Sequence, residues 1–135
     1  MARWCAVILY LDTSTKEARV WLDENYFVRE MGRDMGRDLL GFIKECLMER
    51  EADWRVLSGL AFYKGPGSFT GLRIGVSVMN TLADSLKLPI VGESGTREGQ
   101  GEWRLAAQNR LVAGENDQIT MPFYGAEANI TKPRK

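Results

Sequence analysis

The residues best suited to chemistry lie in one glycine-rich stretch, Lys64–Gly75, which connects an apolar run to a helical pattern. Its glycines permit backbone conformations that other residues rarely adopt, and Ser68 or Thr70 can cap the following helix. Glycine turns at helix starts also hold phosphate groups, although this one matches neither the Walker A motif nor the dinucleotide fingerprint. A tight connection is the favoured interpretation, and a phosphate cradle is the alternative.

A carboxylate and three hydroxyls end the first apolar run of the chain, in the segment Asp12–Thr15. Such residues stabilise turns through side-chain to backbone bonds, and we favour this interpretation over a phosphate or Mg²⁺ contact. Under the alternative, Asp12, Ser68 and Thr70 are the candidate nucleotide-binding residues. The chain contains no histidine, which excludes Ser-His-Asp and Cys-His nucleophilic sites and histidine-based zinc sites. Any catalysis would therefore have to rest on carboxylates, lysines or a borrowed partner, and we assign no catalytic residue, metal ligand or cofactor.

Length and composition indicate a single globular domain of 135 residues, with an apolar fraction of 44% and a charged fraction of 27%. The formal net charge is zero, which argues against strong independent binding to nucleic acid. Cys5 and Cys46 stand far apart in apolar surroundings, as buried thiols of a reducing compartment do. The longest apolar run, Trp4–Leu11, is too short to span a bilayer, and no cleavage site follows it. These features predict a cytoplasmic protein without membrane contact.

Hydrophobic patterns predict five strands and two helices. The first strand is continuously apolar, as expected of a strand buried on both faces, and the next two form an antiparallel meander with it. Two longer segments repeat apolar residues at helical spacing. The predicted strands are Cys5–Leu11, Glu17–Leu22, Tyr26–Val28, Leu57–Tyr63 and Leu88–Gly92, and the predicted helices are Met31–Arg50 and Leu72–Leu86. The order β-β-β-α-β-α-β predicts an α/β fold with a mixed five-stranded sheet on which the helices pack.

The two predicted helices carry more apolar and small positions than a single small sheet can bury. Met31 and Met35 share one face of the first helix, and a core role is favoured for them over a partner surface. The second helix is apolar on most sides, and its small residues allow a close helical neighbour. As a hypothesis, the surface that meets a partner is assigned to eight residues: Met31, Met35, Leu39, Phe42, Ile74, Val78, Thr81 and Leu82.

From Glu93 onward the sequence changes from apolar periodicity to a glycine-rich, polar stretch. Residues 94–101 indicate a linker, Glu102–Val112 a short helix, and Ile119–Lys135 a tail with three cations near its end. A solvated terminus is the favoured interpretation of the tail, and an arm that lies on a partner or on RNA is the alternative. We therefore divide the chain into a lobe, residues 1–93, and a remnant linker, short helix and tail, residues 94–135.

Three segments of the chain resemble the TsaB (YeaZ) family: Ile8–Ser14, Leu60–Gly75 and Leu88–Gly92. The match over the glycine-rich stretch is long and specific, and the whole resemblance covers roughly residues 5–95. It implies one lobe of the fold of actin, Hsp70 and sugar kinases (ASKHA, ribonuclease H-like), which family members normally hold as two related lobes. The stretch between Gly92 and Met121 is too short for a second lobe, so the resemblance implies a short form.

The resemblance also implies a function and partners. Family members are non-catalytic accessory subunits of the bacterial machinery that makes threonylcarbamoyladenosine (t6A) in tRNA, and they lack the metal-binding histidines of the catalytic subunit TsaD. They pair with TsaD through the two helices of the first lobe, often pair with themselves, and are joined by the ATPase TsaE. Such a subunit would meet tRNA only through the complex. The alternative is a nucleotide-binding ASKHA-type enzyme or switch that uses Asp12 and the glycine turn.

Overall fold

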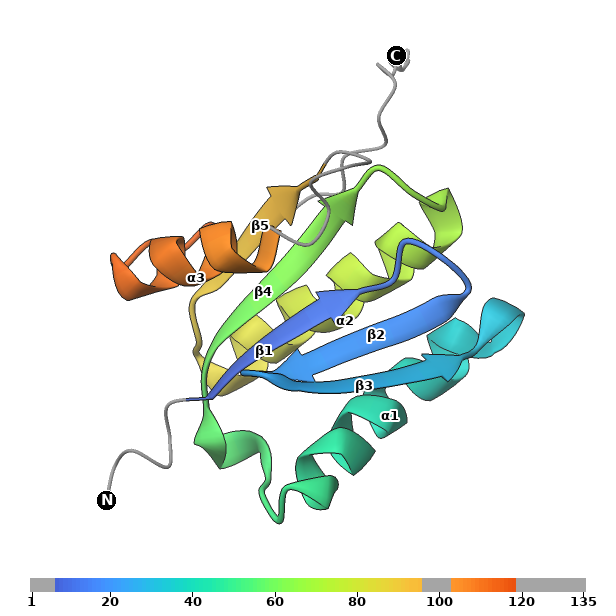
Figure 1. The fold of residues 1–135 in the computed structure, drawn as a ribbon, viewed down its shortest axis with the longest axis horizontal. Coiled ribbons are helices and arrows are strands. Elements are labelled where there is room, and N and C mark those ends of the chain that lie inside the picture. Colours follow the sequence, from blue (N-terminus) through green and yellow to red (C-terminus); the bar gives the residue numbers. More distant parts are fainter. Residues whose placement is uncertain (1–6, 96–102, 119–135) are drawn as a thin grey trace.

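The computed structural model describes residues 7–95 and 103–118, in which strands and helices alternate as in an α/β protein (Figure 1). The strands are β1 (Val7–Asp12), β2 (Glu17–Leu22), β3 (Asn25–Glu30), β4 (Leu57–Gly65) and β5 (Ile90–Ser94). The α-helices are α1 (Met35–Glu49), α2 (Phe69–Leu86) and α3 (Trp103–Val112). The predicted order β-β-β-α-β-α-β is confirmed, and α3 follows it.

The strands form one mixed sheet in the order β3-β2-β1-β4-β5. Neighbours are antiparallel from β1 to β3, whereas β1, β4 and β5 run parallel. The register places Leu9 of β1 beside Leu22 of β2 and Leu60 of β4. All three of these side chains are fully buried. The continuously apolar strand therefore stands at the centre of the sheet, as the sequence predicted.

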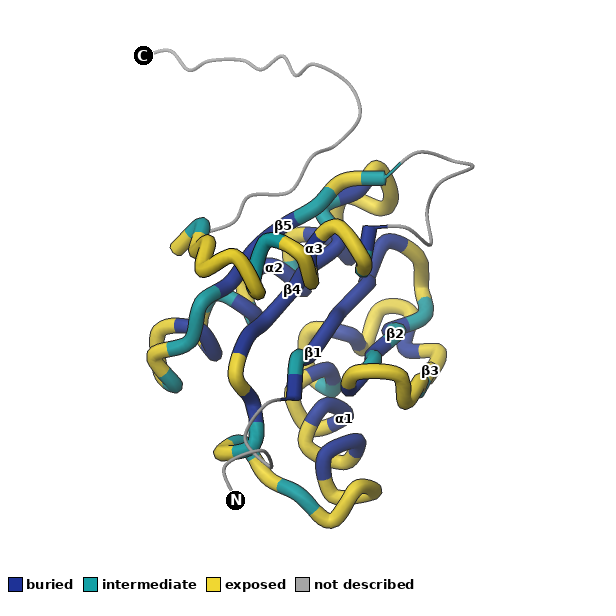
Figure 2. The backbone as a smooth tube through the Cα atoms, turned by 60° about the vertical axis from the view of Figure 1, so that its left-hand side comes forward, coloured by how far each residue is buried: buried dark blue, intermediate teal, exposed yellow. Residues whose placement is uncertain are grey.

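Helices cover both faces of the sheet, so that the described part of the protein has three layers (Figure 1). On one face α1 contacts β2 and α2 contacts β4, while α3 lies across β4 and β5 on the other face. The buried residues lie mainly in the central strands and on the sides of the helices that face them (Figure 2). None of the helices within the described residues has the length and apolar character needed to cross a membrane.

The first helix differs from the prediction at its start. Residues Gly32–Asp34 form a short 3-10 helix, and α1 begins at Met35 rather than at Met31. Gly32 has a φ of 53°, a left-handed conformation that glycine adopts without strain and that a regular α-helix does not contain. The first of the two repeated glycines therefore marks a break before the helix, which agrees with the low helix propensity of glycine.

Helix α3 is anchored by an aromatic cluster on the sheet face opposite α1 and α2. Trp103 is 3% exposed, and its ring lies edge-on to those of Tyr10 and Trp21, with centroids 6.1 and 6.0 Å away. Tyr63 completes the cluster with its ring centroid 5.6 Å from that of Trp103. The short helix predicted over residues 102–112 is thus confirmed, and it covers the second face of the sheet. The tail from residue 119 lies outside the described residues.

Candidate functional site

The glycine-rich stretch forms the turn from β4 into α2, as the sequence predicted. Ser68 is the N-cap residue of α2, and its Oγ accepts a 3.2 Å hydrogen bond from the backbone N–H of Gly71. The backbone N–H of Ser68 donates to the carbonyl oxygen of Ser14 at 2.8 Å. The turn is therefore tied both to its own helix and to the loop that follows β1.

Two glycines let the loop after β1 approach the first turns of α2 closely. Thr13 Oγ1 donates to the carbonyl oxygen of Gly71 at 2.7 Å. A Cβ atom on Gly71 would stand 2.2 Å from the carbonyl oxygen of Thr13, and one on Gly75 would stand 2.2 Å from Thr13 Oγ1. Neither space can hold a side chain, so glycine is required at both positions. This packing supports the structural interpretation of the turn.

The candidate nucleotide-binding residues lie at the same end of the sheet but differ in exposure. Asp12 is 3% exposed, and its Oδ1 accepts a 2.9 Å bond from the backbone N–H of Ser14. Ser68 and Thr70 are exposed at the start of α2. The local bonds of Asp12 and Ser68 are those of a turn and a helix cap, and a role toward a nucleotide stays a prediction. Among the described residues, no group of three or more acidic, cysteine or histidine side chains could hold a metal ion.

Tyr63 supports the glycine turn from β4. Its hydroxyl donates to the carbonyl oxygen of Pro66 at 3.3 Å. Burial is the main cause of the raised pKa of Tyr63, and the negative charge of Asp12 raises it further. The phenol is therefore protonated at neutral pH and serves as a hydrogen-bond donor.

Replacing Ser68 with alanine is expected to lower the free energy of unfolding by about 1 kcal/mol, because α2 loses its N-cap bond. Thr70→Ala is the matched control, since this exposed hydroxyl lies in the same turn and makes no hydrogen bond to a described residue. The control should change stability by less than about 0.5 kcal/mol. Urea denaturation of both variants measures the difference, and equal losses would show that the cap contributes nothing specific.

The predicted partner residues of α1 lie in the core, which corrects that part of the interface hypothesis. Four residues from this region are between 0 and 7% exposed: Met31, Met35, Leu39 and Phe42. They are buried because this stripe is the side of the helical segment that packs on the sheet, where α1 contacts β2. The core role that the sequence favoured for the methionines is confirmed, and these side chains are not available to a partner.

The predicted residues of α2 reach a surface that this helix shares with α1. Thr81 is exposed, Ile74 and Val78 are half-buried, and Leu82 is 7% exposed. Leu40 of α1, which was not among the predicted residues, is 48% exposed beside them. A mostly apolar groove of about 360 Å³ between the two helices is lined by Leu40, Trp54, Ser77, Val78, Thr81, Leu82, Ser85 and Leu86.

A second hollow continues this groove toward the start of α2. It is lined by Gly36, Thr70, Arg73, Ile74, Ser77 and Val78, so that the last two residues border both hollows. A Cβ atom on Gly36 would stand 3.7 Å from Ile74 Cδ1, which is ordinary contact between α1 and α2. Small residues recur at four-residue spacing on this side of α2, at Ser77, Thr81 and Ser85. Their short side chains allow another helix to pack closely against α2. We call the residues that line the two hollows the α1–α2 face.

The comparisons with known proteins agree with this geometry. Residues 29–97, about half of the chain, match a family model described as TsaD, tRNA N6-adenosine threonylcarbamoyltransferase. Similar curated proteins are the tRNA threonylcarbamoyladenosine biosynthesis proteins TsaB of Buchnera aphidicola subsp. Schizaphis graminum, Escherichia coli and Haemophilus influenzae, which are 30, 32 and 33% identical to it. These matches cover 88, 78 and 87% of this chain, and 59, 48 and 52% of the relatives.

Among solved structures, YeaZ from Pseudomonas aeruginosa is 29% identical with a TM-score of 0.58, over 67% of this chain and 44% of that chain. The strand order and the two helices on one face of the sheet define an ASKHA-like α/β lobe. The chain belongs to the family described by the TsaD model, and its recognition as a TsaB (YeaZ) member is confirmed by these relatives. It spans about half the length of the curated relatives it matches.

Proposed function

We propose that this chain is a non-catalytic TsaB-type subunit that binds a TsaD-type catalytic subunit and supports threonylcarbamoyl transfer to adenosine of tRNA. The observation that carries this proposal is the α1–α2 face. Val78 stands at its centre and borders both hollows, and Leu40 exposes 48% of its surface beside the groove. Apolar grooves between helices bind helices of partner proteins, whose apolar side chains fill them.

The similarity to TsaD supports a TsaD-type protein as the partner. The family model matches residues 29–97, a range that contains α1 and α2 entirely. Members of this family therefore carry a corresponding helix pair. Two like lobes can bring their helix pairs together around a pseudo-twofold axis, so that each groove receives side chains from the other lobe.

The non-catalytic character rests on the chemistry of the side chains. The chain has no histidine, so it lacks the imidazole groups that the resemblance assigns to metal binding in TsaD. Asp12 and Ser68, two of the polar residues at the carboxyl end of the sheet, already bond to the backbone of Ser14 and Gly71. Catalysis is thereby assigned to the partner, and this chain contributes the surface that holds the partner in an active arrangement.

The remaining parts of the proposal follow from the same family relation. TsaE joins the pair, the chain pairs with itself when TsaD is absent, and the complex acts in the cytoplasm. The formal net charge of zero supports contact with tRNA only through the complex, because independent binding to RNA depends on neutralising phosphates with cations.

The proposal is tested by titrating the chain with the TsaD protein of the same organism. Val78→Arg places a charge at the centre of the α1–α2 face and is expected to weaken binding at least about 30-fold, as the loss of an interface hot spot does. Leu105→Arg is the matched control, since Leu105 is 59% exposed on α3 at the opposite face. Equal affinities for both variants would refute the assignment of the partner to the α1–α2 face.

A calorimetric titration with ATP, ADP and Mg²⁺ tests the competing interpretation, a nucleotide-binding enzyme or switch. The proposed function predicts no binding in the micromolar range. Micromolar binding that disappears in Asp12→Ala and in Ser68→Ala would favour the competing interpretation. Both variants must first be shown to unfold cooperatively, because each removes a bond that stabilises the turn.

A further inference from the structure

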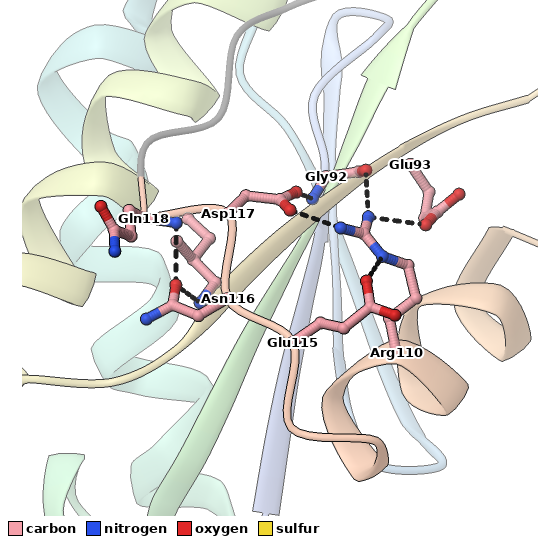
Figure 3. A network of polar contacts seen from close by, with 8 residues as sticks. Gly92, Glu93, Arg110, Glu115, Asn116, Asp117 and Gln118 are labelled. Atoms are coloured by element: carbon pink, nitrogen blue, oxygen red, sulfur yellow. Dashed lines mark hydrogen bonds and ion pairs between the residues drawn. The ribbon is translucent and has the colours of Figure 1, made fainter.

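The edge of the sheet at β5 is closed by side chains that replace a neighbouring strand (Figure 3). The backbone N–H of Ile90 donates to Asn116 Oδ1 at 3.1 Å, and its carbonyl oxygen accepts from the backbone N–H of Asp117 at 2.7 Å. The N–H of Gly92 donates to Asp117 Oδ2 at 2.9 Å. Arg110 Nη1 donates to the carbonyl oxygen of Gly92 at 3.1 Å. The outward polar groups of Ile90 and Gly92 are thus satisfied within the chain.

Arg110 holds this cap in place. Its guanidinium donates to Glu115 Oε1 at 2.7 Å and to Glu93 Oε2 at 2.9 Å, and it also bonds Asp117 (Figure 3). The hydrogen bonds to Glu115 and then Glu93 are the main causes of the raised pKa of Arg110. The cap is therefore a built structure, and another strand cannot add to β5 without displacing it.

The opposite edge, at β3, has no such cap within the described residues. A two-residue turn joins Leu22 to Asn25, so the backbone groups of residues 25, 27 and 29 form hydrogen bonds with β2. The backbone N–H and carbonyl groups of residues 26, 28 and 30 point outward, away from the sheet. No described residue outside the ladder bonds these groups. Tyr26 and Val28 are 49 and 46% exposed. The strand pairs with β2 in unbroken register and contains neither proline nor lysine, two residues that commonly protect an edge. Its charged residues, Arg29 and Glu30, stand at its end and form ion pairs with Glu45 and Lys16.

We infer that β3 is an interaction surface for a second copy of this chain. The two β3 strands pair antiparallel around a twofold axis at Phe27, and the sheets of both copies join into one. In this register Tyr26 of each copy stands opposite Val28 of the other, so an aromatic and a β-branched side chain meet twice. This interaction is separate from the α1–α2 face and goes beyond the proposed function.

The side chains of β3 favour a second copy as the occupant. Trp21 packs against Tyr26 with ring centroids 5.0 Å apart, which holds the tyrosine ring on the face where Val28 of the other copy arrives. Asn25 of one copy stands opposite Arg29 of the other, and this pair contains no like charges. At each end of the pairing, Glu24 of one copy comes close to Glu30 of the other, and a positive charge lies beside these two carboxylates.

That charge belongs to Lys16, whose Nζ lies 3.3 Å from Glu30 Oε2. It offsets the approach of the second carboxylate from the other copy. The axis at Phe27 is perpendicular to the sheet, so the α1–α2 faces of both copies lie on the same side of the joined sheet. Each face stays available to its own partner, because α1 and α2 cover only one side of the sheet.

Sedimentation equilibrium over a range of concentrations tests the inference, with all variants made in a Val78→Arg background to remove contacts through the α1–α2 face. The parent is expected to approach twice the mass of one chain as its concentration rises. Val28→Lys should weaken this association at least tenfold, because it places two charges at the centre of the pairing. Leu105→Lys, on α3, should leave it unchanged. A parent that stays monomeric, or equal association of the two lysine variants, would overturn the inference.

Cross-linking tests the register. A chain with Cys5→Ser and Cys46→Ala that carries Phe27→Cys places two thiols on the axis, at a non-hydrogen-bonded pair with Cα atoms about 4.5 Å apart. Mild oxidation should give a covalent dimer of this variant. Tyr26→Cys in the same background should give little dimer, since position 26 faces position 28. A dimer from Tyr26→Cys alone would refute this register. Because this experiment contains no TsaD, its result is independent of the proposed function.

Discussion

Replacing Gly71 with alanine is expected to lower the free energy of unfolding by about 3 kcal/mol, near the upper end of the usual cost of overpacking. The added methyl group would stand 2.2 Å from the carbonyl oxygen of Thr13. The obstacle is backbone rather than a flexible side chain, so the loop after β1 and the first turn of α2 must move apart. That movement also lengthens the bond from Thr13 Oγ1 to the Gly71 carbonyl oxygen, which is 2.7 Å here.

Gly41→Ala is the control for this substitution and should have the opposite sign. Gly41 lies inside α1, and a Cβ atom there would meet nothing within 4 Å. Alanine at this position should stabilise the protein by about 0.5–1 kcal/mol, the usual difference between the two residues in a helix. Urea denaturation measures both variants. A neutral Gly71→Ala would show that the contact between the loop and α2 is not tight.

Replacing Trp103 with alanine is expected to lower the free energy of unfolding by about 3–5 kcal/mol, the cost of removing a buried aromatic ring. The ring is 3% exposed and packs against Tyr10, Trp21 and Tyr63. Its loss leaves a cavity and releases α3 from the sheet. Near-ultraviolet circular dichroism and urea denaturation follow the two consequences separately.

Leu105→Ala is the matched control on the same helix, since Leu105 is 59% exposed. It should change stability by less than about 1 kcal/mol. If Trp103→Ala were equally mild, α3 would be a dispensable attachment to the lobe. The predicted boundary between residues 93 and 94 would then describe separable parts of the chain.

The order of the first seven elements could be predicted because each strand and helix has its own local pattern. The strand Glu17–Leu22 matches the prediction at both ends, and every second residue, on one face of the sheet, is buried. The turn at Ser68 was also predictable, because glycines and a capping hydroxyl before an apolar helix indicate such a turn locally. What they do not indicate is that the glycines admit the backbone of Thr13, a residue distant in sequence.

Contacts between distant segments could not be predicted from one sequence. The Arg110 cap joins residues of β5 to residues after α3, and its residues look like ordinary surface charges along the chain. The assignment of α1 residues to a partner surface failed for a related reason. Helical spacing shows that Met35 and Leu39 share a stripe, but it cannot show whether that stripe faces the sheet or a partner. Leu40, one position further on, marks the exposed side.

The decisive experiment measures the rate of t6A formation in tRNA by the TsaD and TsaE proteins of the same organism, with and without this chain. The chain alone should give no product, and its addition to the other two proteins should clearly increase the rate. The increase should persist with Leu105→Arg and disappear with Val78→Arg. Product from the chain alone, or full stimulation by Val78→Arg, would show that the chain is not an accessory subunit that acts through the α1–α2 face.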